Sequence, residues 1–189
     1  FIVPRNDTKD EYLKNKALEN GIDYLAPVKV NSDEFYQQAI TYNCNIFVSM
    51  SYNQIFRERI YNLPKYKTIN CHAGKLPFYR GRNILNWVLI NDEKEFGITV
   101  HYVDNGIDTG DIILQRTFPI TDNDDYHTLL ETAYVECPKI LYQSIKMIQN
   151  GTSLRIPQNI ISQYGLYCGM RRLGDEIIDW KMTSRNIFN

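Results

Sequence analysis

Residues 68–81 read TINCHAGKLPFYRG, and they change from an apolar strand into a loop rich in glycine and basic side chains. Side chains two positions apart on a strand point to the same face, so we expect Asn70 and His72 to face together. An amide donor beside an imidazole that titrates near neutral pH suits a reaction at a carbonyl group. The stretch therefore raises a catalytic hypothesis, although a structural Asn–His pair is the commoner meaning of this spacing alone.

Strands and helices alternate on both sides of this stretch. We expect strands in residues 1–3, 24–28, 45–50, 67–73, 96–104 and 111–117, and helices in 7–21, 31–40, 83–91 and 125–150. The alternation predicts an α/β fold, with a Rossmann-like, mostly parallel sheet, helices on both of its faces, and a loop-rich C-terminal extension. Ligands bind such sheets beyond the carboxyl ends of the strands, where the quoted stretch lies.

Two helix boundaries depend on single residues. Thr8 is the expected N-cap of the first helix, because Glu11 follows three positions later as in a capping box. Pro138 falls inside the longest helical pattern, where we expect the helix to break or restart, because proline removes a backbone donor.

The composition limits the class of protein. The chain has 189 residues, 43% of them hydrophobic, and a net charge of −1, so no global basic field would attract nucleic acid. No apolar run approaches the roughly 20 residues that span a bilayer. The four cysteines lack CxxC spacing, which argues against a zinc site and fits a reducing cytosol, so we expect a cytoplasmic location. The first and last residues read as cut from a longer protein.

A third polar group comes at the end of a second expected strand, GITVHYVD. Asp108 lies in VDNGIDTGD, whose glycines Gly106 and Gly110 allow close backbone approach, and it is our candidate for orienting His72. The same DTG triplet occurs in aspartic proteases. Here it has no second copy, and that mechanism would give His72 no role.

The loop after the candidate strand is basic. Lys75, Arg80 and Arg82 precede a helix that begins near Asn83, and cations beside a helix N-terminus suit an anion. Phe78 and Tyr79 could flank a base or a sugar. A solvated basic loop explains the same residues equally well.

Taken together, INCHAGKLPFYRG, the NW at 86–87 and GITVHYVDNGIDTGDI resemble the folate-dependent formyltransferase family. The similarity runs from about residue 45 to residue 116, with a weaker echo in Pro157-Gln158 and in IIDW at 177–180. GRNILNW is most similar to the sugar-nucleotide N-formyltransferases. The chain departs from many members after His72, where Gly74-Lys75 replace a Ser-Leu pair.

The resemblance implies a Rossmann-like formyltransferase fold, no metal, and 10-formyltetrahydrofolate as co-substrate. By position, Asn70, His72 and Asp108 match the family's catalytic residues. Asn70 would donate to the oxyanion, His72 would move protons, and Asp108 would hold the imidazole and favour its charged form. The pterin would lie against a set of cofactor residues: Met50, Tyr52, Gln54, Ile55, Asp104, Gly106 and Ile107.

The resemblance also implies a division of the chain and a substrate. Residues 1–150 would form the catalytic domain, without the family's usual first βα unit, and residues 151–189 would begin a smaller C-terminal region. The acceptor would be the amino group of a nucleotide-linked sugar. The residues expected to bind this substrate are Lys75, Phe78, Tyr79, Arg80 and Arg82. The expected partners are folate and sugar nucleotide, with neither nucleic acid nor membrane; a homodimer is left open.

Two other functions remain open at this point. One is methionyl-tRNA formyltransferase, which would need a basic surface for tRNA that a net charge of −1 does not suggest. The other is a folate- or nucleotide-binding module without turnover. The joint presence of Asn70, His72 and Asp108 argues against that module.

Overall fold

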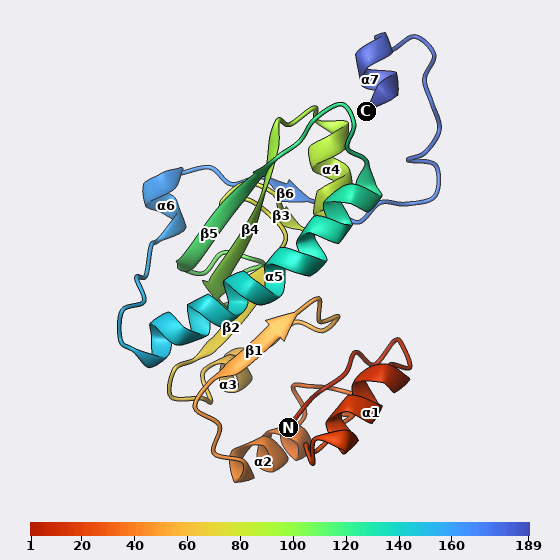
Figure 1. Cartoon of the computed structure of the whole chain (residues 1–189). Coiled ribbons are helices and arrows are strands. Elements are labelled where there is room, and N and C mark those ends of the chain that lie inside the picture. The colour runs from red at the N-terminus through yellow and green to blue at the C-terminus, as the bar shows by residue number, and fades with distance from the viewer. The chain divides into compact units, whose positions relative to one another are not determined.

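The computed structural model describes all residues from 1 to 189, and it divides the chain into two compact units, Phe1–Asn70 and Cys71–Asn189. Figure 1 shows the elements of both units. The boundary lies inside strand β2 (Thr68–His72), next to the residues that raised the catalytic hypothesis. The expected domain boundary at residue 150 stays a prediction.

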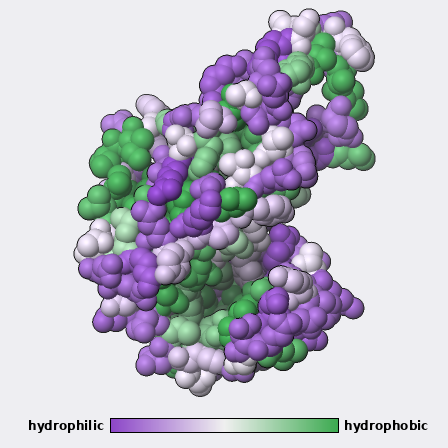
Figure 2. Space-filling model, viewed as in Figure 1, coloured by the Kyte–Doolittle hydropathy of each residue, from purple (hydrophilic) through white to green (hydrophobic).

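The first unit consists of short elements around a small apolar core. They are α1 (Glu11–Glu19), α2 (Asp33–Thr41), β1 (Phe47–Met50), α3 (Glu58–Tyr61) and the start of β2. Phe35 and Ala39 of α2 pack with Val30 and Ile60 to form the core. Helix α1 buries only Ala17, and Figure 2 shows its outer face as mostly hydrophilic.

Helix α1 begins later than the sequence suggested. Its N-cap is Asp10, whose carboxylate accepts a hydrogen bond of 2.8 Å from the backbone N–H of Leu13. Thr8 is therefore not the N-cap. A carboxylate satisfies a free N–H and also interacts favourably with the positive end of the helix, so Asp10 has an advantage over a threonine at this place.

The strands that we expected at residues 1–3 and 24–28 are reduced to one bridge. Ile2 pairs in parallel with Tyr24, through hydrogen bonds from Ile2 N to Asp23 O and from Leu25 N to Ile2 O. Strand β1 lies next to β2 in the sheet, and Phe47 N donates to Lys67 O beside it.

The second unit is built on strands β4 (Glu95–Tyr102) and β5 (Ile112–Pro119), which pair antiparallel. Only residues 103–111 join them, and a parallel pair would need a crossover of a dozen or more residues. The sheet is therefore mixed, with the order β1-β2-β4-β5. The pairing register of β4 and β5 shifts between Val100 and His101. This irregularity changes the direction of the side chains that follow.

Helix α5 (Tyr126–Gln149) packs against β4 and β5, as Figure 1 shows. A capping box of Asp125 and Thr128 starts it, and it continues through Pro138 without a break. The expectation of a break at Pro138 is wrong. Pro138 is exposed while Cys137 and Ile140 beside it are buried, so packing of the inner face stabilises the helix despite the missing donor.

The remaining elements of the second unit are short. They are β3 (Arg80–Gly81), α4 (Ile84–Ile90), α6 (Gln158–Ile161), β6 (Tyr167–Cys168) and α7 (Ser184–Phe188). Strands β3 and β6 pair in parallel, with Arg80 opposite Tyr167 and Gly81 opposite Cys168. None of the helices is both long enough and apolar enough to cross a bilayer.

Candidate functional site

Strand β2 ends at His72, whose side chain is buried. Its Nε2 lies 2.7 Å from the carbonyl oxygen of Tyr79. Because a carbonyl only accepts hydrogen bonds, Nε2 carries the proton and Nδ1 is the nitrogen that can gain or lose one. Asn70 lies two residues earlier in the same strand and is half-buried.

Asp108 faces two histidines. Its Oδ2 lies 3.6 Å from His72 Nδ1, and its Oδ1 lies 3.4 Å from His101 Nε2. The backbone N–H of Gly81 donates to Oδ2 over 2.9 Å and fixes the carboxylate. The structure thus brings His72 and Asp108 together, as the sequence predicted, and it adds His101, which the sequence reasoning missed.

His101 repeats the arrangement of His72. Its Nδ1 lies 2.8 Å from the carbonyl oxygen of Tyr102, and its Nε2 faces Asp108. The two rings lie edge to face, with centroids 6.5 Å apart. A polar residue inside the apolar run GITVHYV was a signal for His101 of the same kind that singled out His72.

Opposing effects set the protonation of Asp108. Burial raises the pKa of Asp108, but the hydrogen bond from His101, the charge of His72 and the hydrogen bond from Gly81 outweigh it and lower the pKa to about 2. The carboxylate is therefore ionised at every pH at which the protein is expected to work.

Burial also controls His72. It lowers the pKa of His72 below the ordinary value of 6.5, although the charge of Asp108 and the contact with the Tyr79 carbonyl act in the opposite direction. Asp108 thus favours the charged form of His72, as the resemblance implied. Asp108 does stabilise the imidazolium, but desolvation has the larger effect and His72 is neutral near pH 7.

A neutral, buried imidazole beside an ionised carboxylate can act as a general base. His72 Nδ1 can accept a proton, and the imidazolium that results would then donate to Asp108 while Nε2 keeps its bond to Tyr79. This is the chemistry that the geometry allows at the end of β2.

We expect Asp108→Asn to lower stability in a pH-dependent way. The folded-state pKa of Asp108 lies near 2 and the ordinary value is 3.8, so ionisation contributes about 2 kcal/mol above pH 4, which is lost as the pH falls toward 2. The free energies of unfolding of wild type and variant should therefore differ by about that amount at pH 7 and converge at pH 2. Urea titrations at several pH values measure this, with the exposed Asp179→Asn as control. A gap that stays constant with pH would contradict the interpretation.

Two of the three cations of the basic loop already have partners within the protein. Lys75 pairs with Glu95, and the guanidinium of Arg80 binds the side chain of Gln158. Arg82 is exposed, and its Nη1 donates to Met170 Sδ over 3.8 Å. Among the three cations, Arg82 is the one best placed to meet a ligand, and the contacts predicted for Lys75 and Arg80 stay predictions.

The two aromatic residues of this loop differ. Phe78 is exposed, which suits a ligand contact. The side chain of Tyr79 is buried, donates its hydroxyl to Glu93 and accepts a hydrogen bond from Asn91. Tyr79 supplies its backbone carbonyl to His72, a role that its side-chain type did not indicate.

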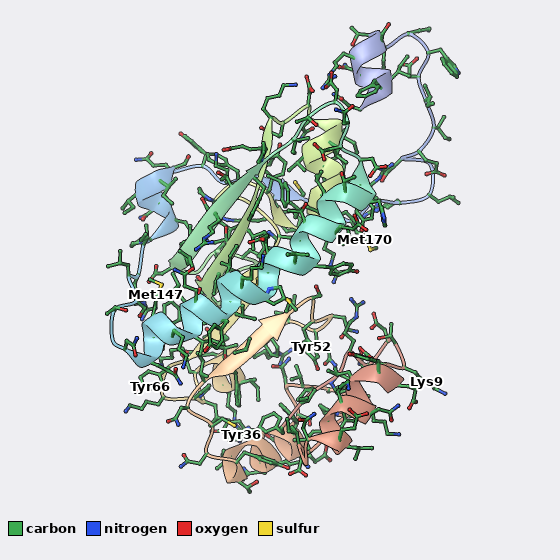
Figure 3. All side chains as sticks on the ribbon, viewed as in Figure 1. Lys9, Tyr36, Tyr52, Tyr66, Met147 and Met170 are labelled. Atoms are coloured by element: carbon green, nitrogen blue, oxygen red, sulfur yellow. The ribbon has the colours of Figure 1, made fainter.

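The expected cofactor residues of the first unit lie in and near a cavity. The cavity has a volume of about 350 Å³, and Met50 and Tyr52 are among its lining residues. The hydroxyl of Tyr52 is buried without a hydrogen-bond partner, and its ring stacks on Phe56; Figure 3 labels Tyr52 just past the end of β1. Gln54 instead holds the backbone of Val28 and Val30, and Ile55 is exposed.

The expected cofactor residues of the second unit shape a turn. Asp104 accepts hydrogen bonds from Gly106 N at 3.1 Å and from Thr109 Oγ1 at 2.5 Å. A Cβ on Gly106 would lie 2.1 Å from Thr109 Oγ1, so the turn requires glycine. Ile107 is exposed at its tip. The contacts of these residues with a pterin stay a prediction.

The segment GRNILNW, residues 81–87, forms hydrogen bonds with a later part of the chain. Asn83 Oδ1 accepts from Arg171 N at 3.0 Å, and the indole N–H of Trp87 donates to Gly169 O at 2.9 Å. Both side chains thereby hold residues 169–171 beside α4. The similarity of this segment to sugar-nucleotide enzymes thus coincides with a packing role.

Comparisons with known proteins assign the chain to a family. The family model described as "Formyl transferase" matches residues 4–145. A methionyl-tRNA formyltransferase of Pelotomaculum thermopropionicum is 34% identical over 94% of this chain and 56% of its own length. The chain thus spans little more than half of the curated relatives that it matches.

Two solved structures are similar in fold and sequence. The formyltransferase PseJ from Anoxybacillus kamchatkensis, in complex with UDP-4,6-dideoxy-4-formamido-L-AltNAc and tetrahydrofolate, is 26% identical, with a TM-score of 0.66 over 86% of this chain and 82% of that one. An N-formyltransferase from Helicobacter canadensis, in complex with folinic acid and dTDP-3-aminofucose, is 28% identical, with a TM-score of 0.72 over 93% of this chain and 61% of that one.

Proposed function

Because this chain belongs to the formyl transferase family, we propose that the whole protein transfers a formyl group from 10-formyltetrahydrofolate to the amino group of a nucleotide-linked sugar, most simply a dTDP-amino sugar. Such products serve surface polysaccharide biosynthesis, in the cytoplasm. The observation that carries the proposal is the buried pairing of His72 with Asp108.

The reaction needs a base, an oxyanion donor and a proton donor. The acceptor amine attacks the formyl carbon, the bond from that carbon to the folate nitrogen breaks, and one proton moves from the amine to the folate nitrogen. We assign the proton transfer to His72 Nδ1, which Asp108 stabilises when it becomes charged. Asn70, two residues before His72 in β2, is assigned to the formyl oxygen.

The folate side of the proposal has its own support. The two similar structures described above hold tetrahydrofolate or folinic acid. In this chain most of the side chains that line the cavity at Met50 and Tyr52 are apolar, and the hydroxyl of Tyr52 is unsatisfied, a combination that suits a flat ligand with polar edges. Met50 and Tyr52 are our proposed folate contacts in the first unit, and the turn at Asp104–Ile107 is the proposed contact in the second unit.

The acceptor is proposed from the same two structures, whose sugar ligands carry UDP and dTDP. The exposed Arg82 and Phe78 offer a cation for a diphosphate and a ring for a base. The chain's net charge of −1 provides no broad basic surface for RNA.

A second candidate acceptor is initiator methionyl-tRNA. The curated relative at 34% identity is a methionyl-tRNA formyltransferase, and that observation keeps this acceptor in the test. The two candidates share the chemistry at His72 and differ only in the amine.

The deciding experiment presents both acceptors to the full-length protein. The enzyme is incubated with 10-formyltetrahydrofolate and either UDP- and dTDP-linked amino sugars or methionyl-tRNA, and formylated product is measured by mass spectrometry. We expect formyl transfer to an amino sugar. Formylation of tRNA alone would replace the acceptor and keep the reaction, whereas folate binding without any product would reduce the protein to a binding module.

Arg82→Ala should weaken sugar-nucleotide binding. A charge-assisted contact with a diphosphate contributes about 1.5–3 kcal/mol, so the Michaelis constant for the sugar nucleotide should rise by about ten-fold or more. The constant for the folate should change far less. Steady-state kinetics with both substrates varied measures the two, with Lys94→Ala as the exposed control. An unchanged constant for the sugar nucleotide would remove Arg82 from the acceptor site.

A further inference from the structure

Gln158 is a buried polar side chain at the start of α6, and all of its hydrogen-bonding capacity is used. Its Nε2 donates to Asp108 O and to Gly110 O, each over 2.8 Å. Its Oε1 accepts from Arg80 Nε at 3.1 Å and from Arg80 Nη2 at 2.7 Å. An amide thus links the loop that carries Asp108 to β3.

The chemistry of its partners dictates the orientation of this amide. The guanidinium of Arg80 only donates, and the two carbonyls only accept. A flipped amide would place donors against donors and oxygen against oxygen at all four contacts. Glutamine is therefore the residue type that this place demands, because its side chain alone combines this length with a donor side and an acceptor side.

The contacts form a closed circuit around Asp108. Gln158 holds the Asp108 carbonyl and binds the side chain of Arg80, and Gly81, the next residue, donates its N–H to the Asp108 carboxylate. Asp108 has a φ of +54°, a left-handed conformation that a side-chain-bearing residue adopts at a cost. The circuit holds both ends of this residue, its carbonyl and its carboxylate.

The surroundings leave the loop little freedom. A Cβ on Gly110 would lie 1.9 Å from Tyr102 O, so the loop backbone is packed directly on the end of β4. Arg80 N donates to Leu166 O at 2.9 Å, which ties β3 to the segment that follows Gln158. Residues 158–166 thus hold β3 and the loop of Asp108 from a part of the chain that is separate from β2 and β4, the strands that carry the two histidines.

From this circuit we infer that Gln158 is a positioning residue, which fixes the carboxylate of Asp108 between His72 and His101. It acts by holding the Asp108 backbone while Gly81 holds the carboxylate. The expected effect on turnover rests on the proposed function; the expected effect on the histidines does not.

The sharpest variant is Gln158→Glu. Glutamate keeps the length and the contact with Arg80, but it replaces a donor by an oxygen that faces the carbonyls of Asp108 and Gly110. We expect the turnover number to fall roughly ten- to hundred-fold, because small displacements of catalytic groups have effects of this size. Gln163→Glu introduces the same charge at an exposed place five residues later and is the matched control.

The decisive readout is the NMR signals of the three histidine rings in the full-length protein without ligands, together with the titration of His72. Asp108 raises the pKa of His72, so a displaced carboxylate should move the His72 titration in the direction that Asp108→Asn moves it. The chemical shifts of the His101 ring should change as well, because the same carboxylate faces it. The chemical shifts of His127, exposed on α5 beside Glu131, should stay as in the wild type.

The outcomes separate the two proposals. A moved His72 titration with changed His101 chemical shifts supports the positioning role even if the wild type formylates no acceptor, in which case only the proposed function fails. A His72 titration and His101 chemical shifts that match those of Gln163→Glu overturn the positioning role, whatever the turnover. Gln158→Met, which removes all four contacts without adding charge, gives the same comparison should the glutamate variant not fold.

Discussion

Replacing His72 by asparagine should lower the turnover number of the full-length enzyme by roughly 10²–10⁴, the usual effect of losing a positioned proton carrier. Asparagine is polar and smaller than histidine, so it fits the buried position without overpacking and the variant should stay folded, although its shorter amide does not replace the Nε2 bond to the Tyr79 carbonyl. Its amide cannot take up a proton near neutral pH. The loss should therefore appear in the chemical step and leave the binding of both substrates close to that of the wild type.

Single-turnover kinetics at saturating substrates measures this effect. His127→Asn is the control, because that histidine lies exposed on α5 and contacts only Glu131 among the acidic residues. The wild-type rate should also decline as the pH falls below the ordinary histidine value of 6.5, since burial lowers the pKa of His72 and protonation removes the base. Near-wild-type turnover in His72→Asn would make His72 structural and refute the proposed mechanism.

Gly74→Ala should impair the same group without touching its chemistry. A Cβ at this position would lie 2.4 Å from His72 Nε2 and 2.5 Å from Tyr79 O, directly at the hydrogen bond that orients the imidazole. Gly74 cannot move aside easily, because its carbonyl accepts from Thr99 Oγ1 at 2.7 Å in the buried interior. We expect a loss of turnover of about 10²-fold and a destabilisation of about 1–3 kcal/mol.

The matched control is Gly169→Ala, where a new Cβ would meet no atom within 4 Å. A double-mutant cycle adds a second check. If Gly74→Ala acts by displacing the imidazole, it should have little further effect on turnover in the His72→Ala background. An undiminished effect in that background would show that the alanine acts elsewhere in the loop.

The expected loss of turnover depends on how directly each residue acts on the imidazole of His72. His72 and Gly74 act at the reacting group, Asp108 acts on the charge of His72, and Gln158 acts on Asp108 through the backbone. Each step away from the imidazole should reduce the loss of turnover. Arg82 stands outside this chain of contacts, and its replacement should change a binding constant and leave the chemical step unaltered.

Local patterns determined much of this protein. The alternation of strands and helices predicted the α/β fold, which the family match and the similar structures confirm. The order N-x-H, LPFYRG and DNGIDTGD predicted the family, because the spacing of polar residues at strand ends is a property of the sequence itself. The pairing of His72 with Asp108 was also foreseen, since His72 ends one strand and Asp108 lies in the loop that follows another.

The tertiary structure alone decided the protonation of His72 and the partners of Asp108. Burial is a sum over the whole fold, so the dominance of desolvation over the charge of Asp108 cannot be read from spacing. The carboxylate of Asp108 also contacts His101 and Gly81, and its backbone carbonyl contacts Gln158. These partners come from segments up to 50 residues away in the sequence. Hydrogen bonds to backbone atoms leave no mark on side-chain type, which is why the Tyr79 carbonyl and the Gly81 N–H became visible only once the chain was folded.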